Sequence, residues 1–162
     1  MDEIYKTYLS KIYRYVLYLV GDSDRAEDIT QETFIKTWQF LPDFSKEKGT
    51  IQAILYRIAR NLVIDYQRKK KMVSLESAGG ESIADSVNLV DDLADKDEMA
   101  EIRSTLLFLP KEDRELVVLR YFEDLSYKEV AEVSGSSEGA VRIRVHRALK
   151  TLKNELSKRV KN

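Results

Sequence analysis

Apolar residues recur every three or four positions along most of the chain, which is the period of an α-helix with one buried face. The first such stripe consists of Ile4, Tyr8, Ile12, Tyr15 and Leu19. Alternation at every second position, which marks a half-buried strand, is nearly absent. The pattern therefore predicts an all-α fold.

Two further helices complete a first domain in this prediction. One begins at Ser23 or Asp24, either of which can cap it, and stops before Pro42. Its buried side consists of Ile29, Phe34, Trp38 and Leu41. The next covers about 50–71, with an apolar stripe at Ile51, Leu55, Ile58 and Leu62. Basic and polar residues follow the same spacing on its other side, so this helix presents one apolar and one basic face.

A helix-turn-helix is predicted after residue 125. Ser126 and Glu129 have the spacing of a capping box in front of a short amphipathic helix. Ala131 is small where two helices cross, Gly135 can adopt the positive φ of a tight turn, and Val141 can insert into the core. This spacing predicts a DNA-binding motif.

The second helix of that motif has an apolar stripe and a cationic remainder. We expect Ser136 to cap it. Its stripe is Val141, Val145, Ala148, Leu152 and Leu156, and the cations off the stripe are Arg142, Arg144, Arg147 and Lys150. Those cations are expected to face phosphates, whereas side chains near the helix start, at Ser137, Glu138 and Arg142, are expected to contact base edges.

The net charge of the chain is only −1, but individual segments have large net charges of opposite sign. Segment 43–72 has a net charge of +5, segment 73–98 has −7 and segment 136–162 has +6. Two basic surfaces are thus separated by a stretch that nucleic acid would repel. Residues 73–93, with paired glycines, serines and scattered apolar residues, are expected to form a flexible acidic linker between domains over 1–72 and 94–162.

Composition removes most enzymatic functions. The chain has no cysteine and one histidine, which excludes disulfides, thiolate chemistry and most zinc or histidine-dependent schemes. The six glycines form neither a dinucleotide fingerprint nor a Walker loop. We therefore expect no catalytic residues, no metal and no cofactor. No segment is apolar enough for a signal peptide or a membrane span, so we expect a cytoplasmic protein without direct membrane insertion.

Three motifs occur in an order that resembles one known family. They are the segment AEDITQETF at 26–34, the segment LYRIARNLVID at 55–65, and the stretch from Leu109 and Pro110 through the helix-turn-helix. Together they resemble the extracytoplasmic-function (ECF) sigma factors of bacterial RNA polymerase. The sequence departs from that pattern at Ile54, where the family usually has tryptophan, and at Ser136, where it commonly has an aliphatic residue.

The resemblance implies three groups of binding residues. Contact with a coiled coil in the largest subunit of core polymerase is implied for Asp28, Gln31 and Glu32, which share one helical face. Recognition and melting of the minus-10 element are implied for Phe44, Tyr56, Arg57, Arg60, Asn61, Asp65 and Arg68. Recognition of the minus-35 element is implied for Ser136, Ser137, Glu138, Gly139, Arg142, Arg144, His146 and Arg147.

The resemblance also implies a function without covalent chemistry. A protein of this family is a dissociable specificity subunit that binds duplex and single-stranded promoter DNA, and an anti-sigma factor usually inhibits it. We expect the acidic linker to occupy a basic polymerase channel in place of nucleic acid. An ordinary helix-turn-helix regulator is the first alternative, but it does not explain the two N-terminal motifs. A small helical hydrolase is the second, and it would need carboxylates converging in a pocket.

Overall fold

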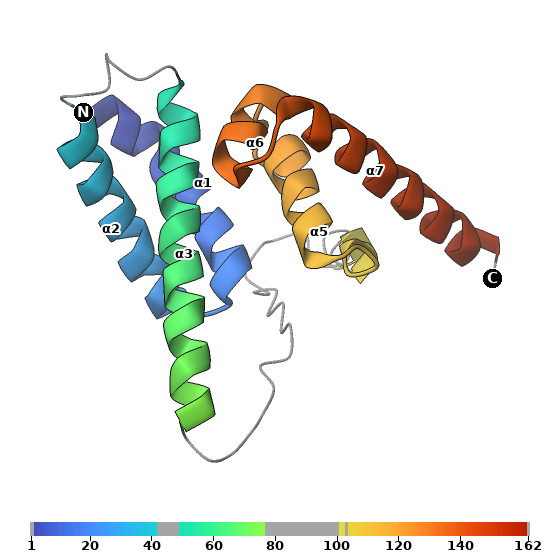
Figure 1. Cartoon of the computed structure of the whole chain (residues 1–162), viewed down its shortest axis with the longest axis horizontal. Coiled ribbons are helices and arrows are strands. Elements are labelled where there is room, and N and C mark those ends of the chain that lie inside the picture. Colours follow the sequence, from blue (N-terminus) through green and yellow to red (C-terminus); the bar gives the residue numbers. More distant parts are fainter. Residues whose placement is uncertain (1, 42–48, 77–100, 103, 162) are drawn as a thin grey trace. The chain divides into compact units, whose positions relative to one another are not determined.

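The computed structural model describes residues 2–41, 49–76, 101, 102 and 104–161, which fall into two compact units (Figure 1). Unit 1 is Met1–Val90 and unit 2 is Asp91–Asn162. Every regular element within these described ranges is helical, which confirms the all-α prediction. Phe44 and residues 77–93 of the predicted acidic linker lie outside the described residues.

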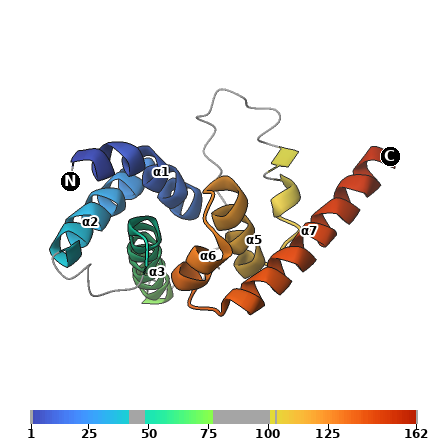
Figure 2. The ribbon, with the colours of Figure 1, turned by 90° about the horizontal axis from the view of Figure 1, so that it is seen from above.

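Unit 1 is a bundle of three helices, each packed against the other two (Figure 2). They are α1 (Asp2–Val20), α2 (Ser23–Phe40) and α3 (Ile51–Glu76). Its fully buried large side chains are Ile12, Tyr15, Val16, Phe34, Leu55, Tyr56 and Val63. Gly21 joins α1 to α2 with a φ of 72°, a left-handed conformation that suits glycine. The interior of the bundle is therefore filled by aromatic and branched side chains from all three helices.

The start and the inner face of α2 differ from the prediction. The N-cap is Asp22, whose carboxylate accepts from the backbone N–H groups of Asp24 and Arg25 at 2.9 and 3.3 Å. Much of the buried face is threonine, at positions 30, 33 and 37, and each hydroxyl donates to the carbonyl four residues earlier. These internal bonds satisfy the hydroxyls, so the threonine methyl groups can pack as apolar surface.

The buried stripe of α3 is rotated from the predicted one. Ile58 and Leu62 are only half-buried, whereas Ala59 and Val63 are buried. The cause is Tyr56, which is fully buried and meets Tyr15 of α1 edge to face, with ring centres 5.1 Å apart. The helix also continues to Glu76, so the first four residues of the predicted linker belong to it.

Unit 2 contains the helix-turn-helix. Its elements are α5 (Lys111–Val117), the π-helical turn η2 (Val118–Phe122), α6 (Tyr127–Ser134) and α7 (Glu138–Lys161). The capping box between Ser126 and Glu129 is formed in both directions, at 3.1 Å each. Gly135 ends α6 with a φ of 73°, and Val141 of α7 is fully buried. The predicted motif is therefore confirmed, although Ser137 rather than Ser136 caps α7, by accepting from the N–H of Ala140.

The turn η2 changes the face on which Tyr121 lies. In a continuous α-helix, Tyr121 would follow Val117 by one turn and share its buried side. The wider π turn shifts the register, and Tyr121 is instead 47% exposed, whereas Leu119 is fully buried. Tyr121 therefore lies at the surface, where its side chain forms a hydrogen bond with Tyr127 of α6.

Candidate nucleic-acid and protein-binding surfaces

The acidic face of α2 consists of Asp28, Gln31 and Glu32. All three side chains are exposed, and they project away from Phe34 and Thr33, which are buried in unit 1. Glu32 forms an ion pair with Lys36 one turn later, at 3.7 Å, between two half-exposed side chains. An exposed pair of this kind contributes little to stability, so these carboxylates have little structural role and can bind a cationic partner.

The basic strip of α3 consists of Arg57, Arg60, Asn61, Asp65 and Arg68. The first two are half-buried and the other three are exposed. Arg68 donates to Asp65 at 2.9 Å, so the single carboxylate of the strip is paired with a cation of the same helix. The remaining positive charge lies on one side of α3, where a polyanion can follow the helix.

Tyr56, one of the predicted minus-10 residues, is a core residue instead. Tyr56 has no exposed surface, and therefore its predicted contact with the minus-10 strand, which would require the ring to stack on a base, is wrong. Ile54, at the position of the family's tryptophan, is 4% exposed and also faces the interior. The predicted stripe of α3 left Tyr56 off the buried side, whereas its ring packs against Tyr15 of α1.

The recognition face of α7 is the exposed side of its first three turns. Ser137, Glu138, Gly139, Arg142, His146 and Arg147 are all exposed, and Ser136 is half-buried. Arg142 donates to Glu138 at 2.9 Å. A Cβ atom built on Gly139 would meet no atom within 4 Å. The predicted minus-35 residues apart from Ser136 and Arg144 are therefore accessible on one short helical segment.

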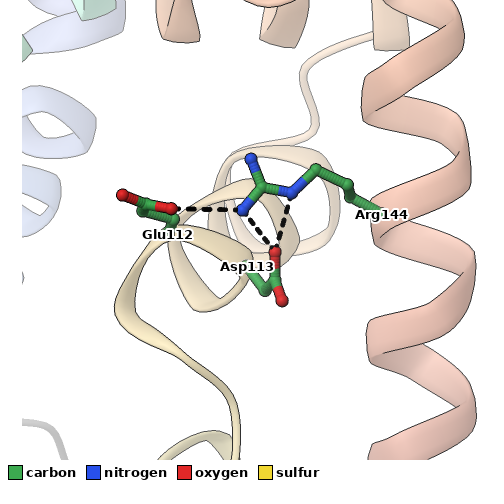
Figure 3. Close-up of polar contacts among 3 residues, drawn as sticks. All are labelled: Glu112, Asp113 and Arg144. Atoms are coloured by element: carbon green, nitrogen blue, oxygen red, sulfur yellow. Dashed lines mark hydrogen bonds and ion pairs between the residues drawn. The ribbon is translucent and has the colours of Figure 1, made fainter.

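Arg144 is not part of that accessible set, because its guanidinium group points to α5 (Figure 3). Its Nε donates to Asp113 Oδ1 at 2.9 Å, and its Nη2 lies 2.6 Å from the same oxygen. A second, longer contact of 3.5 Å reaches Glu112, whose side chain is 83% exposed. Arg144 thus ties α7 to the start of α5, which fixes the orientation of the recognition helix within unit 2.

An aromatic contact that sequence reasoning missed holds Arg142. Its guanidinium carbon lies 4.6 Å from the centre of the Tyr127 ring, and that of Arg120 lies 4.8 Å from the same centre. A hydrogen bond with Tyr127, together with burial, raises the pKa of the Tyr121 hydroxyl above its usual value. The shared ring orients Arg142 at the edge of the recognition face, and the arginine and tyrosine spacing alone gave no signal of it.

Comparison with known families assigns both units. Residues 4–72 match the sigma-70 region 2 family, and residues 99–152 match the sigma-70 region 4 family. None of the helices in the described ranges is both long enough and apolar enough to cross a membrane.

Relatives of known function match almost the whole chain. The ECF RNA polymerase sigma factors SigW and SigM of Bacillus subtilis are 34% and 33% identical to it, each over 95% of this chain. The matches cover 87% of SigW and 95% of SigM. SigE of Mycolicibacterium smegmatis, also an ECF sigma factor, is 32% identical over 97% of this chain, which spans 62% of that longer protein.

Solved structures give the same fold. The sigma factor RpoE of Bartonella quintana, determined in complex with the anti-sigma factor NepR, has a TM-score of 0.75 at 25% identity, with 96% of each chain covered. CnrH, in complex with the cytosolic domain of CnrY, has a TM-score of 0.67 at 25% identity, covering 97% of this chain and 87% of CnrH.

Proposed function

The chain belongs to the ECF group of the sigma-70 family, and from this premise we propose that unit 1 binds core polymerase and the opened minus-10 strand while unit 2 recognises the minus-35 element. As a sigma factor it directs RNA polymerase to specific promoters and is not an enzyme. The recognition face of α7 is the observation that supports assigning the minus-35 element to unit 2. Its exposed cations lie opposite a buried apolar stripe in a helix-turn-helix.

The acidic face of α2 is the surface we assign to core polymerase. Its carboxylates and amide share one exposed side of a helix whose other side is buried, so a partner can reach all three together. Carboxylates on a helix bind arginine and lysine side chains through charge-assisted hydrogen bonds. This chemistry suits a basic helical partner such as the polymerase coiled coil.

The basic strip of α3 is the surface we assign to the separated minus-10 strand. Arginines spaced one helical turn apart can track the phosphates of a single strand, and Asn61 can hydrogen-bond to an unpaired base. Asp65 is held by Arg68 at 2.9 Å and is assigned to orienting that arginine. Stacking on Tyr56 has no place in this assignment, because its ring is buried.

Run-off transcription with purified core polymerase and a promoter library tests the proposal. The double variant Asp28→Ala with Glu32→Ala should abolish promoter-specific transcripts. The matched control removes two exposed acids from the first turn of α1, Asp2 and Glu3, by the same change to alanine, and should keep full activity. Equal activity of the two double variants would refute the assignment to α2, and duplex binding without any transcript would indicate a conventional regulator.

We also assign to the protein a cytoplasmic location and an anti-sigma partner. The location follows from its proposed binding partners, since core polymerase and promoter DNA are found in the cytoplasm. Support for the partner comes from RpoE, which resembles this chain over 96% of its length and was solved with an anti-sigma factor bound. Affinity capture of the chain from non-induced cells should recover a protein that suppresses run-off transcription, and recovery of no such inhibitor would contradict this assignment.

A further inference from the structure

Ile143 is an apolar side chain in the middle of the cationic recognition face. It is 54% exposed and lies between Arg142 and Arg144 in the first half of α7. Burial of an isoleucine side chain normally stabilises a protein, and this one is left in water on the surface that we assign to DNA. Nothing in the packing of unit 2 requires an isoleucine at this position.

Helical spacing puts Ile143 at the centre of that face. Gly139 precedes it by four residues, His146 follows by three and Lys150 by seven, so these residues lie on one side of the helix. The opposite side consists of Val141, Val145 and Ala148, all buried. Ile143 is therefore the side chain that projects most directly away from the core of unit 2.

Gly139 leaves the backbone beside Ile143 uncovered. A Cβ atom there would touch nothing within 4 Å in the protein, so the first turns of α7 can approach another molecule closely. The flanking charges decide what that molecule is. Arg142 and Arg147 on either border, with Lys150 beyond, favour a polyanion and disfavour an apolar protein surface, which would leave these cations desolvated.

We propose that Ile143 contacts the 5-methyl group of a thymine in the minus-35 major groove and sets the preference for thymine at that base pair. This inference rests on the proposed function of α7. In the major groove only the thymine edge presents a methyl group, so an apolar side chain there distinguishes thymine from the other three bases. Isoleucine offers no hydrogen bond, so its contact depends on that methyl and on exclusion of water.

The test removes that methyl group and nothing else. Promoter templates carry deoxyuridine in place of thymine at one minus-35 position at a time, on either strand, and holoenzyme is assayed for duplex binding and run-off transcription. Burial of one methyl group predicts that one such substitution weakens binding about three- to five-fold for the native chain. The Ile143→Ala variant should bind the native and the substituted template equally, which closes a double-mutant cycle.

Two controls distinguish the loss of this contact from a general loss of DNA binding. Val160→Ala, on the last turn of α7 where the side chain is 87% exposed, should keep the full response to deoxyuridine. The second control replaces the thymine by cytosine, paired with guanine, which should weaken binding. A 5-methyl group on that cytosine should recover part of the lost binding for the native chain but not for Ile143→Ala.

If holoenzyme transcribes but no deoxyuridine position distinguishes the native chain from Ile143→Ala, the inference is wrong. If no template is transcribed, the proposed function itself fails and the inference fails with it.

Discussion

Arg142 and Arg144 show how neighbouring arginines of one helix acquire different roles. Arg142 is exposed and lies against the ring of Tyr127, whereas Arg144 is directed back to Asp113. Residues two positions apart on an α-helix are rotated by about 200°, slightly more than half a turn, so the same type of side chain meets solvent at one position and α5 at the other. Composition alone assigns both to DNA, and only the packing of α7 on α5 separates them.

The pairing of Arg144 predicts a specific pattern of stability effects. Asp113→Asn and Arg144→Gln should each lower the stability of unit 2 by about 1 kcal/mol, a modest value because the pair is partly exposed. Glu112→Gln is the matched control and should change the stability of unit 2 little. The contact of Glu112 with Arg144 is longer, and the Glu112 side chain is mostly in water. Hydrogen exchange of peptides from α5 and α7 measures these differences.

The salt dependence of promoter binding tests the same assignment independently. Loss of a phosphate contact reduces the slope of binding affinity against salt by about one ion, whereas loss of an internal tether leaves that slope unchanged. We expect an unchanged slope for Arg144→Gln and a reduced slope for Arg147→Gln. A reduced slope for Arg144→Gln, with normal stability, would show that this arginine contacts DNA directly.

Tyr56 provides a test of burial against DNA stacking. Tyr56→Ala should destabilise unit 1 by about 3–5 kcal/mol, because it leaves a cavity beside Tyr15. Tyr56→Leu removes the ring but keeps a buried apolar side chain, and it should leave promoter opening intact at temperatures where unit 1 is folded, as measured by permanganate reactivity of unpaired thymines. Fluorescence of Trp38, the one tryptophan in the chain, reports the unfolding of unit 1. Impaired opening by Tyr56→Leu, measured where unit 1 is still folded, would restore the stacking role.

At the level of elements, two glycines of the helix-turn-helix have opposite requirements. Gly135 has a φ of 73° at the end of α6, whereas Gly139 is in the first turn of α7, and neither has an atom near its missing Cβ. Gly135→Ala should therefore destabilise unit 2 by about 1 kcal/mol through the backbone alone. Gly139→Ala should stabilise it by about 0.5–1 kcal/mol through helix propensity.

Circular dichroism and hydrogen exchange of α6 and α7 measure both glycine changes. Only Gly139→Ala should also weaken duplex binding, because the added methyl group faces the surface assigned to DNA. A Gly135→Ala variant as stable as the native chain would show that the turn does not depend on a left-handed residue. Retained affinity of Gly139→Ala would show that the DNA does not approach this part of the backbone closely.

The elements that sequence predicted well are those fixed by local interactions. The capping box at Ser126 and the turn glycine, Gly135, act within a few residues, and both were located correctly. The positions that the sequence analysis predicted wrongly depend on contacts between helices. On α3, Tyr56 is buried against Tyr15 of α1 instead of lying off the buried stripe. The partner of Arg144 lies 31 residues away, beyond the reach of a spacing argument.

At the scale of the whole molecule, each unit buries its own core. Leu119, Val130 and Val145 are fully buried in unit 2, and Ile12 and Phe34 are buried in unit 1. Leu119→Ala should therefore cost about 2–5 kcal/mol in unit 2 and leave the unfolding of unit 1 unchanged. Far-ultraviolet circular dichroism reports both units and Trp38 fluorescence reports unit 1. A parallel shift of the Trp38 transition would instead reveal a single cooperative structure.

The separation of core side from outer side in α7 has a consequence for evolution. Val141, Val145 and Ala148 hold the helix in place, while Ile143, His146 and Lys150 contribute little to folding. Surface substitutions of this kind usually change stability by less than about 0.5 kcal/mol. A duplicated gene can therefore exchange these three residues one at a time, with the protein folded at every step. New regulatory circuits can diverge from a common ancestor along that route, each copy acquiring its own set of target genes.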